Sequence, residues 1–235
     1  MIEIKLLPGS EIEIAGEISA GDFESYREQV IKKLSQEIKI DGFRPGNVPE
    51  KVLIEKIGEL AILEKMAIFA LQKEYPEIIK RQKIKAIGQP EILITKLAKG
   101  NPLGYKIKTA VLPEMDLPDY KKIAKETVIL GDMADIKIQQ QRRLEILDKI
   151  VNETKIELPK ILIEAEKNKM LEDIRSGIEQ SGLKWEDYLS HLKKTEEELI
   201  KDWDKDALKR VKYGLALNEI AEREKIEVPQ DELKR

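Results

Sequence analysis

The spacing of hydrophobic and polar residues predicts β-strands in two stretches of the first half of the chain. Residues 1–20 alternate between apolar and polar side chains. The alternation returns over residues 91–97 and 105–112, on either side of a loop rich in glycine and proline. Because a period of two is typical of a strand with one buried face, these stretches predict an antiparallel sheet.

Between the two stretches the apolar residues recur every three or four positions, which predicts helices. We expect one helix over residues 22–38 with Asp22 as its N-cap, a second over 50–57 and a third that ends near Pro76. Residues 1–112 are therefore predicted to form an α+β domain, in which an antiparallel sheet carries helices on one face.

The second half of the chain has a different pattern. Residues 113–131 begin with a proline-rich segment and show no clear period, so we expect an extended linker there. Residues 132–235 are helical in period throughout, and Thr195 with Glu198 forms the sequence pattern of a capping box. We expect an all-α domain with helical arms.

Composition removes most catalytic chemistry from consideration. The chain has 235 residues, no cysteine and one histidine, His191, which excludes disulfides, thiolate nucleophiles, zinc clusters and Ser-His-Asp triads. Charged residues make up 37%, but Lys+Arg 42 against Asp+Glu 45 leaves a net charge of −3, so no global basic field favours nucleic acid. We expect no enzyme activity and no cofactor. No apolar run is long enough to span a membrane, and the N-terminus is unlike a signal peptide, which predicts a cytoplasmic protein.

The most unusual segment is the loop Gly42–Pro49, which contains two glycines and two prolines. It displays Phe43, which can stack on an unpaired RNA base, beside Arg44, whose planar cation can bind phosphate or carboxylate. The alternative interpretation is that Phe43 folds back onto Val48 and Val52 while Arg44 is solvated.

Two further features have both a functional and a structural interpretation. The lysine-rich stretch 80–85 is either a second RNA-facing patch or an ordinary solvated turn. The apolar residues of the helical half either form cores between helices or line an open groove that holds apolar segments of other chains.

The 42–49 loop, Gly42-Phe43-Arg44-Pro45-Gly46-Asn47-Val48-Pro49, resembles the ribosome-binding signature of the bacterial trigger factor family, Gly-Phe-Arg-x-Gly-x-x-Pro between two helices. Other stretches resemble the family in the same order along the chain. They are Leu117-Pro118-Asp119-Tyr120, Ile156-Glu157-Leu158-Pro159, residues 182–189, residues 195–199 and residues 220–228.

The resemblance implies an ATP-independent chaperone that docks beside the polypeptide exit of the large ribosomal subunit, on ribosomal RNA and a ribosomal protein. The implied ribosome-binding residues are Gly42, Phe43, Arg44, Pro45, Gly46 and Asn47. The helical domain would be a cradle for unfolded or nascent chains, and its apolar candidates are Met170, Ile174, Ile178, Leu199, Trp203, Val211 and Leu215. The resemblance implies no membrane contact and leaves a homodimer open.

Two departures from the family pattern change these expectations. Family members usually carry an FKBP-type prolyl isomerase domain after the linker, whereas this chain passes from Tyr120 directly to helices, so isomerase activity is not implied. Asn47 stands where most family loops have lysine, which predicts fewer phosphate contacts.

Three other functions compete with this one. An RNA-binding or ribosome-assembly factor would use the 42–49 loop alone, with the helices as a scaffold. An isomerase-type enzyme in the helical half would need clustered catalytic residues, which the sequence does not offer. A related helical chaperone of the periplasm would need a signal peptide.

Overall fold

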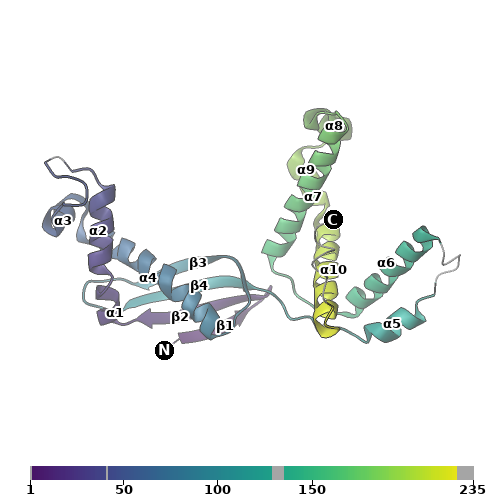
Figure 1. Cartoon of the computed structure of the whole chain (residues 1–235), viewed down its shortest axis with the longest axis horizontal. Coiled ribbons are helices and arrows are strands. Elements are labelled where there is room, and N and C mark those ends of the chain that lie inside the picture. Colours follow the sequence, from purple (N-terminus) through teal and green to yellow (C-terminus); the bar gives the residue numbers. More distant parts are fainter. Residues whose placement is uncertain (1, 41, 129–134, 227–235) are drawn as a thin grey trace. The chain divides into compact units, whose positions relative to one another are not determined.

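The chain divides into two compact units, Met1–Leu112 and Pro113–Arg235 (Figure 1). The structure is a computed structural model that describes residues 2–40, 42–128 and 135–226. Each unit has its own buried apolar cluster.

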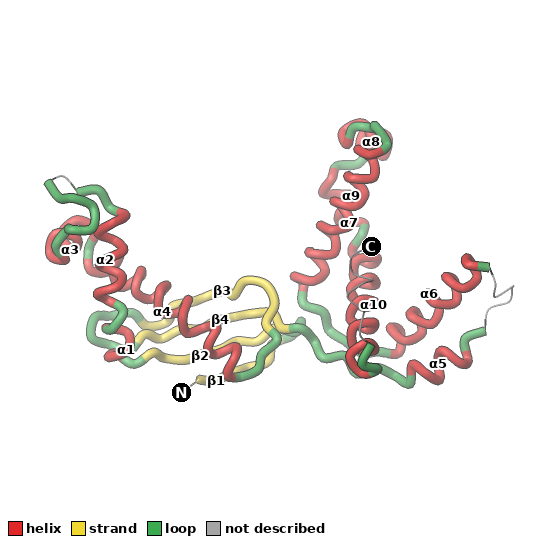
Figure 2. Tube along the Cα trace, viewed as in Figure 1, coloured by secondary structure: helices red, strands yellow, loops and turns green. Residues whose placement is uncertain are grey.

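The first unit is built on a four-stranded antiparallel sheet with the order β1-β2-β4-β3 (Figure 2). The strands are β1 (Ile2–Leu7), β2 (Glu11–Ile18), β3 (Ala86–Lys96) and β4 (Leu103–Val111). Strands β1 and β2 form a hairpin, and β4 pairs with both β2 and β3. Strands β1 and β3 are therefore the two edge strands of the sheet.

Four helices accompany the sheet: α1 (Ala20–Glu24), α2 (Arg27–Glu37), α3 (Glu50–Ile57) and α4 (Glu59–Arg81). One face of the sheet is buried, and the long helix α4 crosses it (Figure 1). Ile14 and its cross-strand partner Ile107 are both 0% exposed. On the other face, Lys106 pairs with Glu13 at 3.0 Å and Lys108 with Glu11 at 2.7 Å. This pattern confirms the predicted α+β class.

Two of the predicted helix boundaries are wrong. The first helix is capped by Ser19, whose Oγ accepts the backbone N–H of Asp22 at 3.1 Å, so Asp22 lies inside the first turn. The third helix does not end near Pro76 but continues to Arg81. Although proline removes one helical hydrogen bond, Ile78 is 0% exposed, and its burial holds the last turns against the core.

The second unit is helical. Its elements are α5 (Tyr120–Glu126), α6 (Ile136–Glu153), α7 (Lys160–Gln180), α8 (Trp185–Leu192), α9 (Glu196–Asp202) and α10 (Asp204–Arg223). Helix α10 packs against α6 and α7, and α5 packs against α6. The capping box is confirmed, because Thr195 Oγ1 accepts the Glu198 N–H at 3.2 Å and Glu198 Oε2 accepts the Thr195 N–H at 2.9 Å.

The linker expected over residues 113–131 is not extended throughout. Asp119 caps α5 by accepting the backbone N–H of Lys122 at 3.0 Å. Met115 and Leu117 are 4% and 8% exposed, and they belong to the apolar cluster of the second unit with residues of α6 and α10. Burial therefore orders a segment whose prolines suggested a spacer. The end of the expected linker, residues 129–131, lies outside the described residues.

Candidate functional site

The 42–49 loop joins α2 to α3 and presents its polar and aromatic side chains to solvent. Phe43 is 40% exposed, and Arg44, Pro45 and Asn47 are also exposed. Arg44 has no ion pair or hydrogen bond from its side chain within the part of the chain that the structure describes. Val48, by contrast, is 6% exposed. The loop is therefore buried near its C-terminal end, at Val48, and it exposes an aromatic ring beside a cation at Phe43 and Arg44.

A tight turn sets the shape of the exposed part. The Asn47 N–H donates to the Arg44 carbonyl at 3.0 Å, with Pro45 and Gly46 as the two central residues. Gly46 has φ +88°, and together with proline in the preceding position this defines a type II turn. Proline fixes its own φ, and glycine adopts the positive φ without strain. The glycines and prolines of the sequence thus specify a stiff turn.

The turn is fastened to α2 by its backbone. The Gly46 N–H donates to the Ser35 carbonyl at 2.7 Å. Ser35 is 2% exposed, and its hydroxyl donates to the Lys32 carbonyl at 2.8 Å. Because α2 packs on the core through Val30 and Leu34, this bond ties the loop to the rigid part of the unit.

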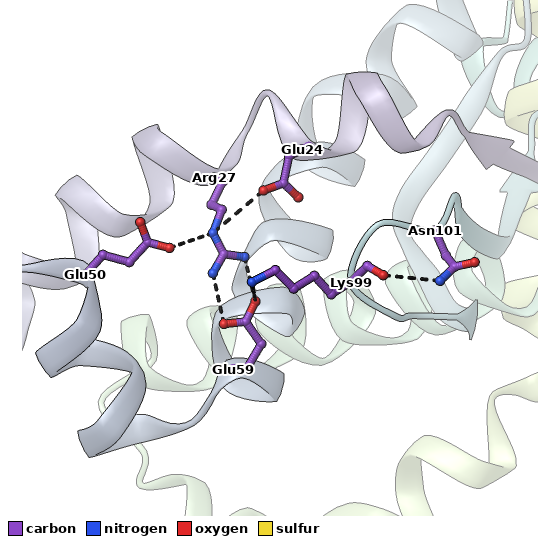
Figure 3. Close-up of polar contacts among 6 residues, drawn as sticks. All are labelled: Glu24, Arg27, Glu50, Glu59, Lys99 and Asn101. Atoms are coloured by element: carbon purple, nitrogen blue, oxygen red, sulfur yellow. Dashed lines mark hydrogen bonds and ion pairs between the residues drawn. The ribbon is translucent and has the colours of Figure 1, made fainter.

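A buried arginine holds the helices on both sides of the loop (Figure 3). Arg27, at the start of α2, places Nε 2.7 Å from Glu50 Oε1 at the start of α3. Its Nη1 and Nη2 lie 2.7 Å and 2.9 Å from the two carboxylate oxygens of Glu59 at the start of α4. Lys99 also pairs with Glu59, at 3.3 Å. Glu50 directly follows Pro49, so this network fixes the end of the loop.

Electrostatics reinforce the network. The hydrogen-bonded Glu59 carboxylate raises the pKa of Arg27, and the Arg27 guanidinium in turn lowers the pKa of Glu59. The Arg27 side chain is only 11% exposed, so these carboxylates offset the free-energy cost of burying its charge.

The second candidate feature is an open groove in the helical unit, with a volume of about 460 Å³. It is formed by α6, α7 and the start of α10. Its lining, here called the helical groove, consists of Leu144, Asp148, Met170, Ile174, Trp203, Asp206, Lys209, Arg210 and Tyr213. Its apolar residues form one surface, and its charged residues form a polar border around that surface.

A polar contact joins two walls of the helical groove. Asp148 of α6 accepts hydrogen bonds from the Tyr213 hydroxyl and from Lys209 Nζ, the latter at 2.6 Å, both from α10. These bonds lower the pKa of Asp148 and raise that of Lys209. The carboxylate therefore remains charged and links α6 to α10 along the groove.

The structure brings some of the predicted residues together and leaves others apart. Gly42, Phe43, Arg44, Pro45, Gly46 and Asn47 all lie in the 42–49 loop. Met170, Ile174 and Trp203 meet at the helical groove, although Met170 is only 5% exposed. Ile178, Leu199, Val211 and Leu215 do not line it. Leu199 is 7% exposed, and Leu215 packs against the apolar cluster of the second unit.

Several lining residues were missed by sequence reasoning. Asp206, Arg210 and Tyr213 follow the predicted Trp203 at spacings of three, four and three, which places all four along one side of a helix. That spacing was a usable signal. Arg27 gave no such signal, because its partners Glu50 and Glu59 are 23 and 32 positions away in the chain.

The lysine-rich stretch 80–85 lies at the end of α4 and in the turn to β3. None of its cations has an ion pair among the described residues. Both earlier interpretations, a solvated turn and a second RNA-facing patch, are compatible with that arrangement.

Comparison with known proteins identifies the family. The model described as "Bacterial trigger factor protein (TF)" matches residues 1–145, and "Bacterial trigger factor protein (TF) C-terminus" matches residues 122–235. The chain belongs to the bacterial trigger factor family. The two matched ranges together span the chain, with no match to an FKBP-type isomerase domain.

Individual relatives agree with this assignment. The chain is 34% identical over 138 residues to a trigger factor of Rhodococcus opacus (strain B4), covering 59% of this chain and 30% of that protein. It is 33% identical over 121 residues to a trigger factor of Mycobacteroides abscessus, covering 52% and 25%. The matches thus span less than a third of these relatives.

A solved structure is also similar. It is described as "Promiscuous Substrate Recognition in Folding and Assembly Activities of the Trigger Factor Chaperone", with 24% identity and a TM-score of 0.45 over 62% of this chain and 34% of that chain. None of the described helices is long and apolar enough to cross a membrane.

Proposed function

We propose that this chain is a cytoplasmic, ATP-independent chaperone that docks at the ribosomal polypeptide exit and shields unfolded or nascent chains. The 42–49 loop would make the docking contact, and the helical unit would bind the emerging chain. Membership of the trigger factor family supports the class of function.

The observation that carries the docking proposal is the exposed pair of Phe43 and Arg44 on a stiff turn. An aromatic ring can stack on an unpaired base, and a guanidinium such as that of Arg44, which has no partner among the described residues, is available for a phosphate or a carboxylate. Because the turn is fixed by Pro45 and Gly46, little conformational entropy would be lost on binding.

The helical groove supports the chaperone part of the proposal. Leu144 is 54% exposed, and Trp203 and Tyr213 remain partly exposed beside it. Non-directional apolar contact suits clients of many sequences. Release would follow when the client buries its own apolar residues, so the cycle would require no nucleotide.

The test is co-sedimentation with bacterial 70S ribosomes over a range of salt concentrations, comparing the intact chain with a Phe43→Ala/Arg44→Ala variant. We expect salt-sensitive binding by the intact chain and its loss in the variant, because each phosphate contact contributes roughly one unit to the salt slope. A Leu93→Ala/Lys65→Ala variant removes an exposed apolar residue and a cation elsewhere on the same unit, and should bind like the intact chain.

The same experiment separates the rival RNA-binding function, which the exposed Arg44 also supports. Loop-dependent binding to free ribosomal RNA, without protection of an unfolded protein from aggregation, would favour an assembly factor. No binding to ribosomes at low salt would remove the docking proposal and leave the helical unit to be tested alone.

A further inference from the structure

An open cleft of about 560 Å³ lies where the end of α4 meets the start of β3. Its apolar lining, here called the α4–β3 cleft, consists of Tyr75, Pro76, Ile79, Ile84 and Ala86. The cleft shares no lining residue with the helical groove or with the 42–49 loop. Its volume is within the range of about 300–1,000 Å³ that is typical of small-molecule sites.

The apolar lining is held by the core beneath it. Tyr75, Ile79 and Ile84 are partly buried, and all three pack against the apolar cluster of the first unit. The Tyr75 hydroxyl shares a hydrogen bond of 3.1 Å with the hydroxyl of Thr109 on β4, which is 2% exposed. The floor of the cleft therefore belongs to the rigid part of the unit.

The turn that ends α4 places two lysines at the border of the cleft. The Ile84 N–H donates to the Ile79 carbonyl at 3.0 Å, and the Lys83 N–H donates to the Lys80 carbonyl at 3.2 Å. With Lys83 at φ +53°, these bonds form a Schellman helix end, which folds the chain back onto the last turn. Lys80 and Lys83 are both exposed, and both line the cleft.

The positive charge at this border is not balanced locally. Lys80 and Lys83 have no ion pair within the described parts of the chain, and no Asp or Glu is among the described residues that line the cleft. The negative end of α4 is satisfied by backbone groups, since the carbonyls of residues 78, 79 and 80 each accept a backbone N–H. The cleft therefore combines an aliphatic wall with two available ammonium groups.

We propose that the α4–β3 cleft binds the anion of an unbranched fatty acid. The alkyl chain lies against Ile79, Ile84 and Ala86, where burial of apolar surface favours it. The carboxylate lies between Lys80 and Lys83, which can donate charge-assisted hydrogen bonds to its two oxygens. This binding goes beyond the proposed function and does not depend on it.

The shape and chemistry of the cleft favour a fatty acid over RNA. Proteins that bind single-stranded nucleic acid stack its bases on aromatic rings. Tyr75 is the only aromatic residue among the described lining, and it is half-buried with its hydroxyl bound to Thr109. The remaining apolar lining is aliphatic, which suits an alkyl chain.

Calorimetric titration of the whole chain with dodecanoate, below its micelle concentration, tests the binding. We expect one saturable site. Dodecanol lacks the charge and acetate lacks the alkyl chain, so dodecanol should bind at least tenfold more weakly and acetate should not bind. A dodecanoate that carries a photoreactive diazirine locates the site, because mass spectrometry should find its label within residues 75–88.

Exchange of the lysines tests the carboxylate contact. Lys80→Gln/Lys83→Gln should weaken dodecanoate binding about tenfold, since two exposed charge contacts are lost. Lys80→Arg/Lys83→Arg should retain it. Lys51→Gln/Lys56→Gln is the matched control, because it removes two exposed lysines of the same unit that do not line the cleft. All six exchanged side chains are exposed, so circular dichroism should show an unchanged fold.

Four results would overturn the proposal. They are the absence of saturable dodecanoate binding, equal affinity for dodecanol, equal losses in the Lys80/Lys83 and Lys51/Lys56 glutamine variants, and a photolabel in the helical groove instead of the α4–β3 cleft. Binding of oligouridylate or of an acidic peptide through Lys80 and Lys83, without dodecanoate binding, would assign the lysines to that partner and equally overturn it. Ribosome co-sedimentation of the same variants is scored separately, so failure of docking is distinguishable from failure of fatty-acid binding.

Discussion

Arg27 and Glu59 form a two-point ion pair that joins the start of α2 to the start of α4, with N–O distances of 2.7 Å and 2.9 Å. Nη2 donates a hydrogen bond to Glu59 Oε2, whereas Nη1 and Glu59 Oε1 are in contact as an ion pair without hydrogen-bond geometry. With Glu50 bound to Nε, three helix starts converge on one cation. The 42–49 loop therefore projects from helices whose starts are held together by Arg27, Glu50 and Glu59.

Removing this cation should destabilise the first unit. We expect Arg27→Met to lower the free energy of unfolding by about 2 kcal/mol, less than for a fully buried pair because Glu50 and Glu59 retain contact with water. Urea unfolding of the variant gives the value. Lys33→Ala, which breaks an exposed pair with Glu37, should change it by less than about 0.5 kcal/mol. Equal effects of the two substitutions would contradict a special role for Arg27.

Acid should weaken the ion pair between Arg27 and Glu59. Arg27 holds the pKa of Glu59 below its ordinary value, so the unfolded state binds this proton more tightly than the folded state. The contribution of Glu59 to stability is therefore fully present above its unfolded pKa of about 4.3 and is lost as pH falls through the lower, folded pKa. Unfolding free energies measured between pH 7 and pH 3 should decline less steeply in Glu59→Gln than in the intact chain. Parallel curves would refute the linkage.

A side chain at Gly46 should strain the turn of the 42–49 loop. A Cβ there would lie 3.6 Å from Gln36 Cγ, so space is adequate, but φ +88° is unfavourable for any L-residue. We expect Gly46→Ala to cost about 1–2 kcal/mol, or to move the loop and weaken ribosome binding. Gly177→Ala is the matched control, because Gly177 lies within α7 with nothing near its Cβ position, and alanine there should stabilise the helix. Denaturant unfolding measures the loss of stability, and co-sedimentation with ribosomes measures the loss of binding that a displaced loop would cause.

The local parts of the fold were predictable because their causes are local. The turn at Arg44–Asn47 follows from proline and glycine, and the capping box at Thr195 follows from two side chains three positions apart. The errors have longer-range causes. Ile78 holds α4 together beyond its proline, and the burial of Met115 orders a segment that resembles a spacer. No local pattern could show either effect, since each depends on contacts between distant segments.

The candidate sites follow the same division. The 42–49 loop could be found from the sequence because consecutive residues determine both its stiff turn and the cation that it carries. The helical groove could be found only in part, because helical spacing shows which residues share a side but not which side remains open. Leu199 satisfied the spacing and is nevertheless buried, whereas Leu144 on a different helix is exposed in the groove.

Leu144 therefore provides the sharpest test of the helical groove. We expect Leu144→Ser to reduce protection of an unfolded protein from aggregation by several-fold, because only the exposed half of the leucine side chain can be buried against the client, and the loss of that burial costs roughly 1 kcal/mol. Protection is measured by light scattering as a chemically denatured protein is diluted into buffer with the chaperone. Leu144 is already 54% exposed, so the substitution should leave the unfolding midpoint nearly unchanged.

Leu217→Ser is the matched control for this substitution. Leu217 is 50% exposed on α10 and does not line the helical groove, so its replacement removes the same chemistry from a similar setting. We expect it to protect the denatured protein as well as the intact chain does. Equal losses in the two variants would mean that apolar exposure anywhere on the helical unit suffices, and full protection by Leu144→Ser would move the client site out of the groove.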